Sequence, residues 1–124
     1  HWPPTAIVGN TLYFKANDGT NGNELWKSDG TASGTVMVKD INSGSSDSFP
    51  DEITAVGNTL YFSANDGTNG VPLWKTDGTV NGTVMVKYFG DGAGGYPMSF
   101  TFIGNTLWFV ANDGSGYDLW KYSL

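Results

Sequence analysis

The chain contains no cysteine and no arginine, and its only histidine is His1. Without cysteine, the protein cannot form disulfides, iron–sulfur clusters or cysteine-ligated zinc sites, and it has no thiol nucleophile. One histidine leaves a histidine-based triad or metal centre almost nothing to use. Arginine is the usual partner of substrate carboxylates and phosphates, so its absence argues against enzymes that bind such groups. These absences favour a protein that is not an enzyme and has no catalytic residues.

Positive charge is scarce as well, because six lysines stand against 12 acidic residues and give a formal net charge of −6 at pH 7. An acidic surface repels phosphates, so nucleic acid and anionic membranes are not expected partners. No apolar run approaches the roughly 20 residues of a membrane-spanning helix, so we expect no membrane insertion. The sequence begins without methionine and without a signal-peptide pattern, so we expect a processed product or a fragment.

Glycine and aromatic residues are abundant: among 124 residues there are 18 Gly, 7 Phe, 6 Tyr and 5 Trp. Gly, Asn, Asp and Thr gather in short clusters, whereas strong helix formers are few. Short strands joined by tight turns are typical of such a composition. The composition therefore predicts an all-β fold.

A repeat of 48 and then 47 residues covers the whole chain, as the starts Gly9, Gly57 and Gly104 show. The three copies read GNTLYFKAND at 9–18, GNTLYFSAND at 57–66 and GNTLWFVAND at 104–113. Further along, ELWKSDGT and PLWKTDGT occupy the same place in the first two repeats, and only DLWK remains in the third. Two repeats are therefore complete, and the third lacks its last part.

Each complete repeat predicts four short antiparallel strands. In the first, Leu12, Phe14 and Ala16 face one way and Tyr13 the other. A unit of ~40–50 residues with four such strands is typical of a β-propeller blade. We therefore predict a single repeat domain over 1–124. Its blades are predicted at 1–41, at 49–88 and, without the outer strand, at 96–124.

Three blades are too few for a closed propeller, which typically has ~4–8. Three arrangements remain open: a piece of a longer propeller, an assembly in which two chains give about six blades, or an open array. The missing strand of the third repeat leaves an open edge at residues 119–121, and open edges invite pairing. A strand from another copy or from a longer parent chain would fill it. We therefore expect other protein chains as partners, through self-association or as subunits of an assembly.

The segments ELWKSDGT (24–31) and GTVMVKDI (34–41) resemble the ELW-x-x-DGT repeat of bacterial secreted and surface proteins. The resemblance covers nearly the whole chain and implies an exported, propeller-like bacterial protein, extracellular or at the cell surface, with no single activity. The SDGT turn is also similar to the Asp-box of sialidase-like propellers, a structural turn between the third and fourth strands. The third copy has Tyr122-Ser123 where Asp-Gly should stand, and so resembles a terminal repeat.

Aromatic residues are the candidate ligand-binding groups. Trp26, Trp74 and Trp120 recur at one position of the repeat. They fit packing between blades or a platform for sugar rings, since an aromatic face offers apolar contact and nearby amides and carboxylates bind hydroxyls. Three aromatics at less regular positions are further candidates: Trp2, Tyr96 and Tyr117.

The turn after the second strand carries oxygen ligands of the kind that calcium prefers, from Asp18, Asn21 and Glu24. The alternative is plain turn chemistry, which Asn-Asp-Gly sequences also serve. The second repeat has Val71-Pro72 in this loop and loses two ligands. Calcium is therefore a weakly supported cofactor, and no other is expected.

These features favour a non-catalytic extracellular scaffold or binding module, either an adhesion element or a subunit of a surface assembly. The alternative is a carbohydrate-binding lectin with sites repeated between blades, since repetition turns weak sites into useful avidity. A sialidase-like enzyme ranks third, because this chain has no arginine for a substrate carboxylate.

Overall fold

The computed structural model describes residues 5–42, 48, 50–67, 70–89, 95–114 and 116–123. These residues form eleven strands and no helix, and hence nothing helical that spans a membrane. Sheet 1 comprises β1 (Thr5–Val8), β2 (Thr11–Asn17), β3 (Asn23–Ser28) and β4 (Val36–Lys39). Sheet 2 comprises β5 (Asp51–Val56), β6 (Thr59–Ser63), β7 (Leu73–Thr76) and β8 (Val84–Lys87). Sheet 3 comprises β9 (Gly95–Ile103), β10 (Thr106–Asn112) and β11 (Tyr117–Ser123).

Each sheet is an antiparallel meander in sequence order, which confirms the all-β prediction. The Gly-Asn pairs close the first hairpin of every sheet, with φ of 60° at Gly9, 63° at Gly57 and 60° at Gly104. Glycine with positive φ at the first position of a two-residue loop matches the twist of the flanking strands. The pairing register also shifts at the same repeat position in two sheets, at Leu25/Trp26 and Leu73/Trp74. The repeat in sequence is thus a repeat in backbone structure.

The turn between β3 and β4 is held by its aspartate. The Asp29 carboxylate accepts hydrogen bonds from Thr31 N, at 3.0 Å, and Thr31 Oγ1, at 2.6 Å. Thr31 Oγ1 accepts in turn from Gly34 N, at 2.9 Å. A Cβ at Gly34 would overlap the Asp29 carboxylate. Asp77, Thr79 and Gly82 repeat every one of these contacts between β7 and β8.

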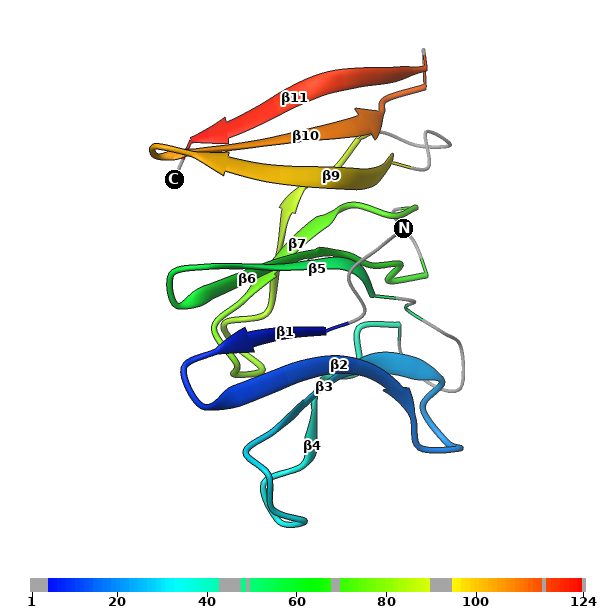
Figure 1. Cartoon of the computed structure of the whole chain (residues 1–124). Coiled ribbons are helices and arrows are strands. Elements are labelled where there is room, and N and C mark those ends of the chain that lie inside the picture. The colour runs from blue at the N-terminus through cyan, green and yellow to red at the C-terminus, as the bar shows by residue number, and fades with distance from the viewer. Residues whose placement is uncertain are drawn as a thin grey trace.

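The three sheets stack in chain order with sheet 2 in the middle (Figure 1). They approach one another chiefly through their first strands β1, β5 and β9. The backbones of β4 and β8 come close only to the neighbouring strand of their own sheet. The gap between sheets therefore widens from the first strand to the fourth.

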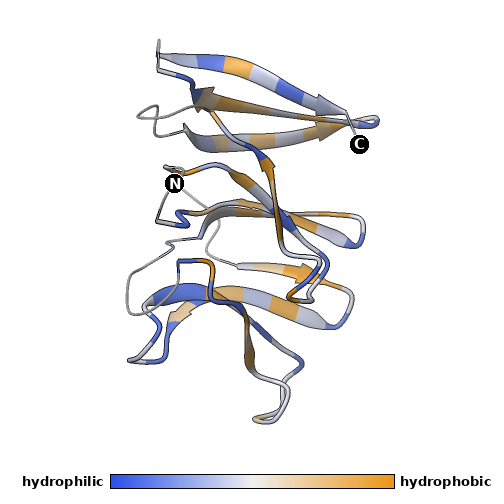
Figure 2. Cartoon of the chain, turned by 180° about the vertical axis from the view of Figure 1, so that it is seen from behind, coloured by the Kyte–Doolittle hydropathy of each residue, from blue (hydrophilic) through white to orange (hydrophobic). Residues whose placement is uncertain are grey.

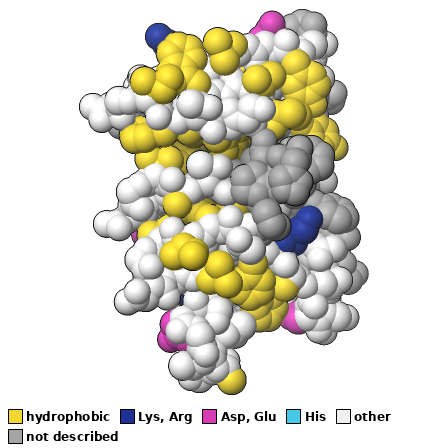
Figure 3. Space-filling model, viewed as in Figure 1, with side chains coloured by type: hydrophobic (Ala, Val, Ile, Leu, Met, Phe, Trp, Pro, Cys, Tyr) yellow, Lys and Arg dark blue, Asp and Glu magenta, His cyan; other side chains and the backbone are white. Residues whose placement is uncertain are grey.

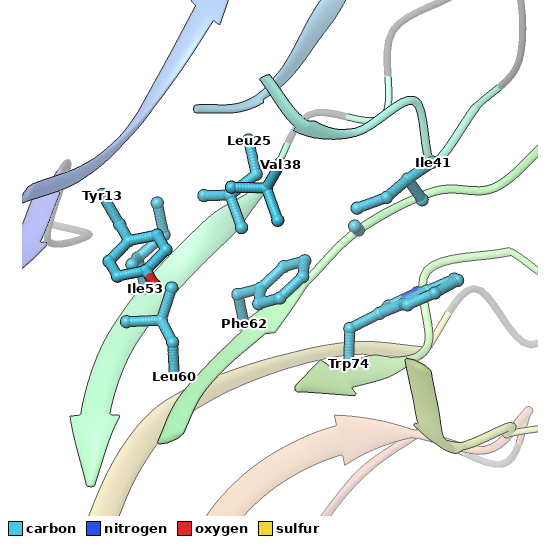
Figure 4. Packing of buried hydrophobic residues seen from close by; sticks show 9 residues of the cluster. Tyr13, Leu25, Val38, Ile41, Ile53, Leu60, Phe62 and Trp74 are labelled. Atoms are coloured by element: carbon cyan, nitrogen blue, oxygen red, sulfur yellow. The ribbon is translucent and has the colours of Figure 1, made fainter. Parts of the chain in front are cut away.

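Two hydrophobic cores lie in these gaps, and Figure 2 shows the apolar bands on the strands that form them. The first core lies between sheets 1 and 2 (Figure 4) and comprises Tyr13, Leu25, Val38, Ile41, Ile53, Leu60, Phe62, Ala64 and Trp74. The second lies between sheets 2 and 3 and comprises Tyr61, Leu73, Phe89, Leu107, Phe109 and Ala111.

Sheet 2 contributes side chains to both cores, one core on each of its faces. We call the side of a sheet that looks toward the earlier sheet its preceding face, and the opposite side its following face. Sheet 2 places Leu60 and Phe62 on its preceding face, in the first core, and Tyr61 on its following face, in the second. The alternation predicted from the Leu-x-Phe-x-Ala pattern is therefore confirmed in this sheet.

Candidate functional site

Glu24 is fully buried where the chain passes from sheet 1 to sheet 2. Its Oε1 accepts a hydrogen bond from Ile41 N at 2.9 Å and its Oε2 one from Asn42 N at 3.4 Å. Burial raises the pKa of Glu24 to about 7. The hydrogen bonds from Ser48, Ile41 and Asn42 oppose this rise, and the charge of Asp40 adds to it. The carboxyl group thus fastens the inter-sheet connection to β3.

Asp18 and Asn21, the other two candidate calcium ligands, lie together in the exposed turn after β2. Asp18 Oδ1 accepts from Thr20 N and Asn21 N, both at 2.8 Å, and Oδ2 accepts from Asn21 Nδ2 at 2.7 Å. These bonds, the one from Asn21 N foremost, hold the pKa of Asp18 below its usual value. In the described part of the chain, no three His, Cys, Asp or Glu residues are grouped closely enough for a metal ion. Calcium binding therefore stays a prediction, and the carboxylate of Glu24 is engaged in the connection instead.

The three repeated tryptophans lie on the preceding faces of their sheets. Trp74 is buried in the first core. Trp120 packs against the second core, where its Nε1 donates to Ala111 O at 3.3 Å and its ring lies 5.3 Å from that of Phe89. Trp26 is half-buried on sheet 1, whose preceding face no described residue of another sheet covers. Packing between sheets thus accounts for Trp74 and Trp120.

Tyr96 and Tyr117 are exposed and lie at the same end of sheet 3. Tyr117 is paired with Asn112 on one side, and Gly95, next to Tyr96, is paired with Asn112 on the other. Tyr96 has a φ of 50°, a conformation that non-glycine residues rarely adopt. The sequence does not predict that these two residues share one end of a sheet, because 20 residues separate them. Trp2, the third irregular aromatic, lies outside the described residues.

Lysine side chains span the wide outer part of the gap between sheets 1 and 2. Lys27 Nζ donates to Gly78 O at 2.6 Å, and Lys39 Nζ donates to Thr83 O at 3.1 Å. Both acceptors belong to the turn between β7 and β8. The corresponding lysines of sheet 2 meet no such turn in the described part of sheet 3, and Lys87 Nζ instead lies 5.3 Å from the ring of Trp120.

The outer edge of sheet 3 is open along β11, where the described residues supply no fourth strand. A cavity of about 330 Å³ opens beside this edge, lined by Val86, Lys87, Phe109, Trp120, Lys121 and Tyr122. Tyr122 lies against Tyr61 of sheet 2, with ring centroids 6.3 Å apart. The open edge predicted for residues 119–121 therefore exists in the structure, with an apolar hollow next to it.

The two outer faces of the stack were missed by sequence reasoning. Leu119 is 68 % exposed, although the repeat-equivalent Leu25 and Leu73 are both 0 % exposed. Figure 3 shows hydrophobic side chains gathered on the surface over sheet 3. The signal was in the repeat: a side chain that is buried in the middle of a stack is exposed at its end.

Comparison with protein-family models, with curated proteins and with solved structures gives no match to this chain. Its function has to be inferred from the geometry of the sheets and their exposed groups.

Proposed function

We propose that the chain is a non-catalytic scaffold or binding module of the β-propeller type, in which the three sheets are successive blades. One observation carries this proposal. Three antiparallel meanders approach one another through their first strands, and the fourth strands of the two complete sheets lie apart from the other sheets, as in blades around a central axis. The repeated turns of Asp29 and Asp77 have the position and bonding of structural turns between third and fourth strands.

The bonding of the acidic side chains Glu24, Asp29 and Asp77 supports binding rather than catalysis. Glu24, whose pKa is raised to about 7, is fully buried and bonded to backbone N–H groups. Asp29 and Asp77 are exposed, but their carboxylates are engaged within their own turns. The resemblance to ELW-x-x-DGT repeats adds the expectation of a bacterial extracellular or surface protein that works in an assembly.

Sedimentation velocity at micromolar concentration tests this proposal. We expect a particle of more than one chain, because three blades do not close a ring of ~4–8. A stable monomer of 13.3 kDa at every concentration would count against a self-assembling scaffold.

A lectin is the second candidate, and the pair of exposed tyrosines favours it. Strands lie ~4.8 Å apart, so the ends of β9 and β11 on either side of Asn112 are ~10 Å apart, a span that suits a small saccharide. A glycan array probed with the wild type and with Tyr117→Ala tests this candidate. Binding that is lost in the variant supports it. An array without hits, or binding that Tyr117→Ala leaves unchanged, rules out this site.

A further inference from the structure

The internal interfaces define what each face of a sheet requires. The preceding faces of sheets 2 and 3 bury a leucine of the second strand, Leu60 at 1 % exposure and Leu107 at 0 %. The following faces of sheets 1 and 2 bury a leucine of the third strand, Leu25 and Leu73. The same pattern is therefore used twice within one chain, and each following face fits the preceding face of the next sheet.

Within the described residues, the stack ends with one face of each kind that no other sheet covers. Sheet 1 has a free preceding face, where Leu12 is 37 % exposed and Phe14 and Trp26 are half-buried. Sheet 3 has a free following face, where Leu119 and Ile103 are exposed and Trp108 is half-buried. The residues at these repeat positions are buried in the two cores or packed against them at the internal interfaces. Because both internal interfaces pair a following face with a preceding face, the two free faces are of complementary kinds.

The groups that make the hydrogen bond at the edge of the internal interface have equivalents on the two outer faces of the stack. At the internal interface, Lys27 Nζ binds Gly78 O, and the Tyr13 hydroxyl lies where a Cβ of Gly78 would be. The equivalent turn of sheet 1 is open, since a Cβ at Gly30 would meet nothing within 4 Å. Its φ of 96° matches the 97° of Gly78, so the turn already has the bound conformation.

The equivalents of Tyr13 and Lys27 in sheet 3 are Trp108 and Lys121. Lys121 Nζ lies 5.8 Å from the centre of the Trp108 ring. This places a cation and an aromatic ring side by side on the following face, as Lys27 and Tyr13 are placed on sheet 1. Sheet 3 therefore carries the groups that would hold the Gly30 turn of another sheet 1.

We infer that the following face of sheet 3 binds the preceding face of sheet 1 of a second copy of this chain, head to tail. The contact repeats the two internal interfaces, with Leu119 packing against Leu12 and Lys121 donating to Gly30 O. Two copies make this contact twice and close a ring of six sheets. Among multiples of three, six alone falls within the ~4–8 blades of a propeller. This inference rests on the proposed blade arrangement.

Two variants, each blocking one face, test this arrangement. Leu12→Asp puts a charge on the preceding face of sheet 1, and Leu119→Asp does so on the following face of sheet 3. Both side chains are solvent-exposed in the single chain, so circular dichroism is expected to show the wild-type fold. Val80→Asp is the matched control, because Val80 is 57 % exposed in the turn between β7 and β8, away from both faces.

Sedimentation velocity of each variant alone and of their equimolar mixture gives the readout. We expect the wild type and Val80→Asp to sediment as dimers and each face variant to sediment as a monomer. The mixture regains a dimer, since Leu12→Asp keeps a working sheet 3 and Leu119→Asp a working sheet 1. This mixed dimer has one contact instead of two and dissociates at higher concentration.

Three outcomes would overturn the inference. A face variant that alone keeps the wild-type dimer shows that its face is not used. Two monomeric variants that do not combine in the mixture exclude the head-to-tail pairing. A wild type that is monomeric removes the second copy as partner and also contradicts the self-assembling scaffold. If neither variant disturbs the wild-type assembly, the inference about these two faces is rejected, whereas the proposed scaffold function is not contradicted.

Discussion

The two internal interfaces have the same backbone arrangement and different chemistry. Between sheets 1 and 2, a buried carboxyl group, Glu24, fastens the connection, and Ile41 lies beneath it. Between sheets 2 and 3, the same two repeat positions hold Pro72 and Phe89. The Phe89 ring packs edge to face with two other rings, and its centroid lies 6.2 Å from that of Phe109 and 5.3 Å from that of Trp120.

This difference shows what the stack requires. The polar connection needs hydrogen bonds because a buried carboxyl group without partners is costly. The aromatic connection has no buried carboxyl group to satisfy, because Pro72 stands in the place of Glu24, and the Phe89 ring fills the volume instead. Filling the gap between diverging sheets is therefore the common requirement, and either chemistry meets it.

The largest effect is expected from removing the ring at the aromatic connection. Phe89→Ala empties the space between Phe109 and Trp120 and should lower the free energy of unfolding by about 3–5 kcal/mol. Ile41→Val, at the same position of the polar connection, should cost only about 1 kcal/mol. Urea denaturation at one fixed protein concentration measures both. A Phe89→Ala loss no larger than that of Ile41→Val would refute the volume-filling role.

The polar connection should make the stability depend on pH. The pKa of Glu24 is raised from 4.5 to about 7 in the folded chain, so folding favours the protonated form. The resulting stabilisation is fully present below pH 4.5 and is lost as the pH rises through about 7. This shift corresponds to a contribution on the order of 3 kcal/mol.

Glu24→Gln isolates this contribution, because glutamine has similar volume and does not titrate. We expect the wild type to lose more free energy of unfolding than the variant between pH 4.5 and pH 8, measured by urea denaturation on both proteins. Asp118→Asn, which removes an exposed carboxylate of β11, is the control. Equal pH dependence in the wild type and Glu24→Gln would show that Glu24 does not titrate differently on folding.

The turns held by Asp29 in sheet 1 and by Asp77 in sheet 2 make the same hydrogen bonds, so they should respond alike. Gly34→Ala and Gly82→Ala each place a Cβ against the aspartate of their turn and should cost about 1–3 kcal/mol. In an Asp29→Ala background, Gly34→Ala should cost less, because the overlapping carboxylate is gone. Thermal unfolding of the single and double variants measures this coupling, and additive losses would contradict it.

The smallest loss of stability is expected from replacing a lysine, and it should differ between Lys27 and Lys75, which occupy the same position of the repeat. Lys27→Met removes the hydrogen bond to Gly78 O and should cost about 1 kcal/mol. Lys75→Met should cost almost nothing, since the turn that would accept its bond is not part of sheet 3 as described. Equal losses in chemical denaturation would mean that the lysine stems, and not the bond across the gap, stabilise the sheets.

The strands were predictable because the repeat presents the same pattern three times. The alternation of Leu60, Tyr61 and Phe62 assigns side chains to faces, and the Gly-Asn pairs mark the first turn of each sheet. Trp74 lies at a recurring position of the repeat, for which packing between blades is one of the two expected roles, and it is buried in the first core.

The role of Glu24 was not predictable, because its hydrogen-bond partners are backbone groups 17 and 18 residues away that no local pattern indicates. Its sequence position in an Asn-rich turn suggested calcium instead. The placement of Tyr96 and Tyr117 at one end of sheet 3 depends on both β9 and β11 pairing with β10, and hence on the register of the whole sheet. Which faces stay open depends on the number of sheets in the stack, a property of the assembly.

A crystal structure of the species that associates in solution tests most directly whether the three sheets are half of a ring. We expect six sheets around one axis, with Leu119 of each copy buried against Leu12 of the other and the Gly30 turn held by Lys121. A particle of three sheets with Leu12 and Leu119 both in solvent, or an assembly through any other surface, would contradict it.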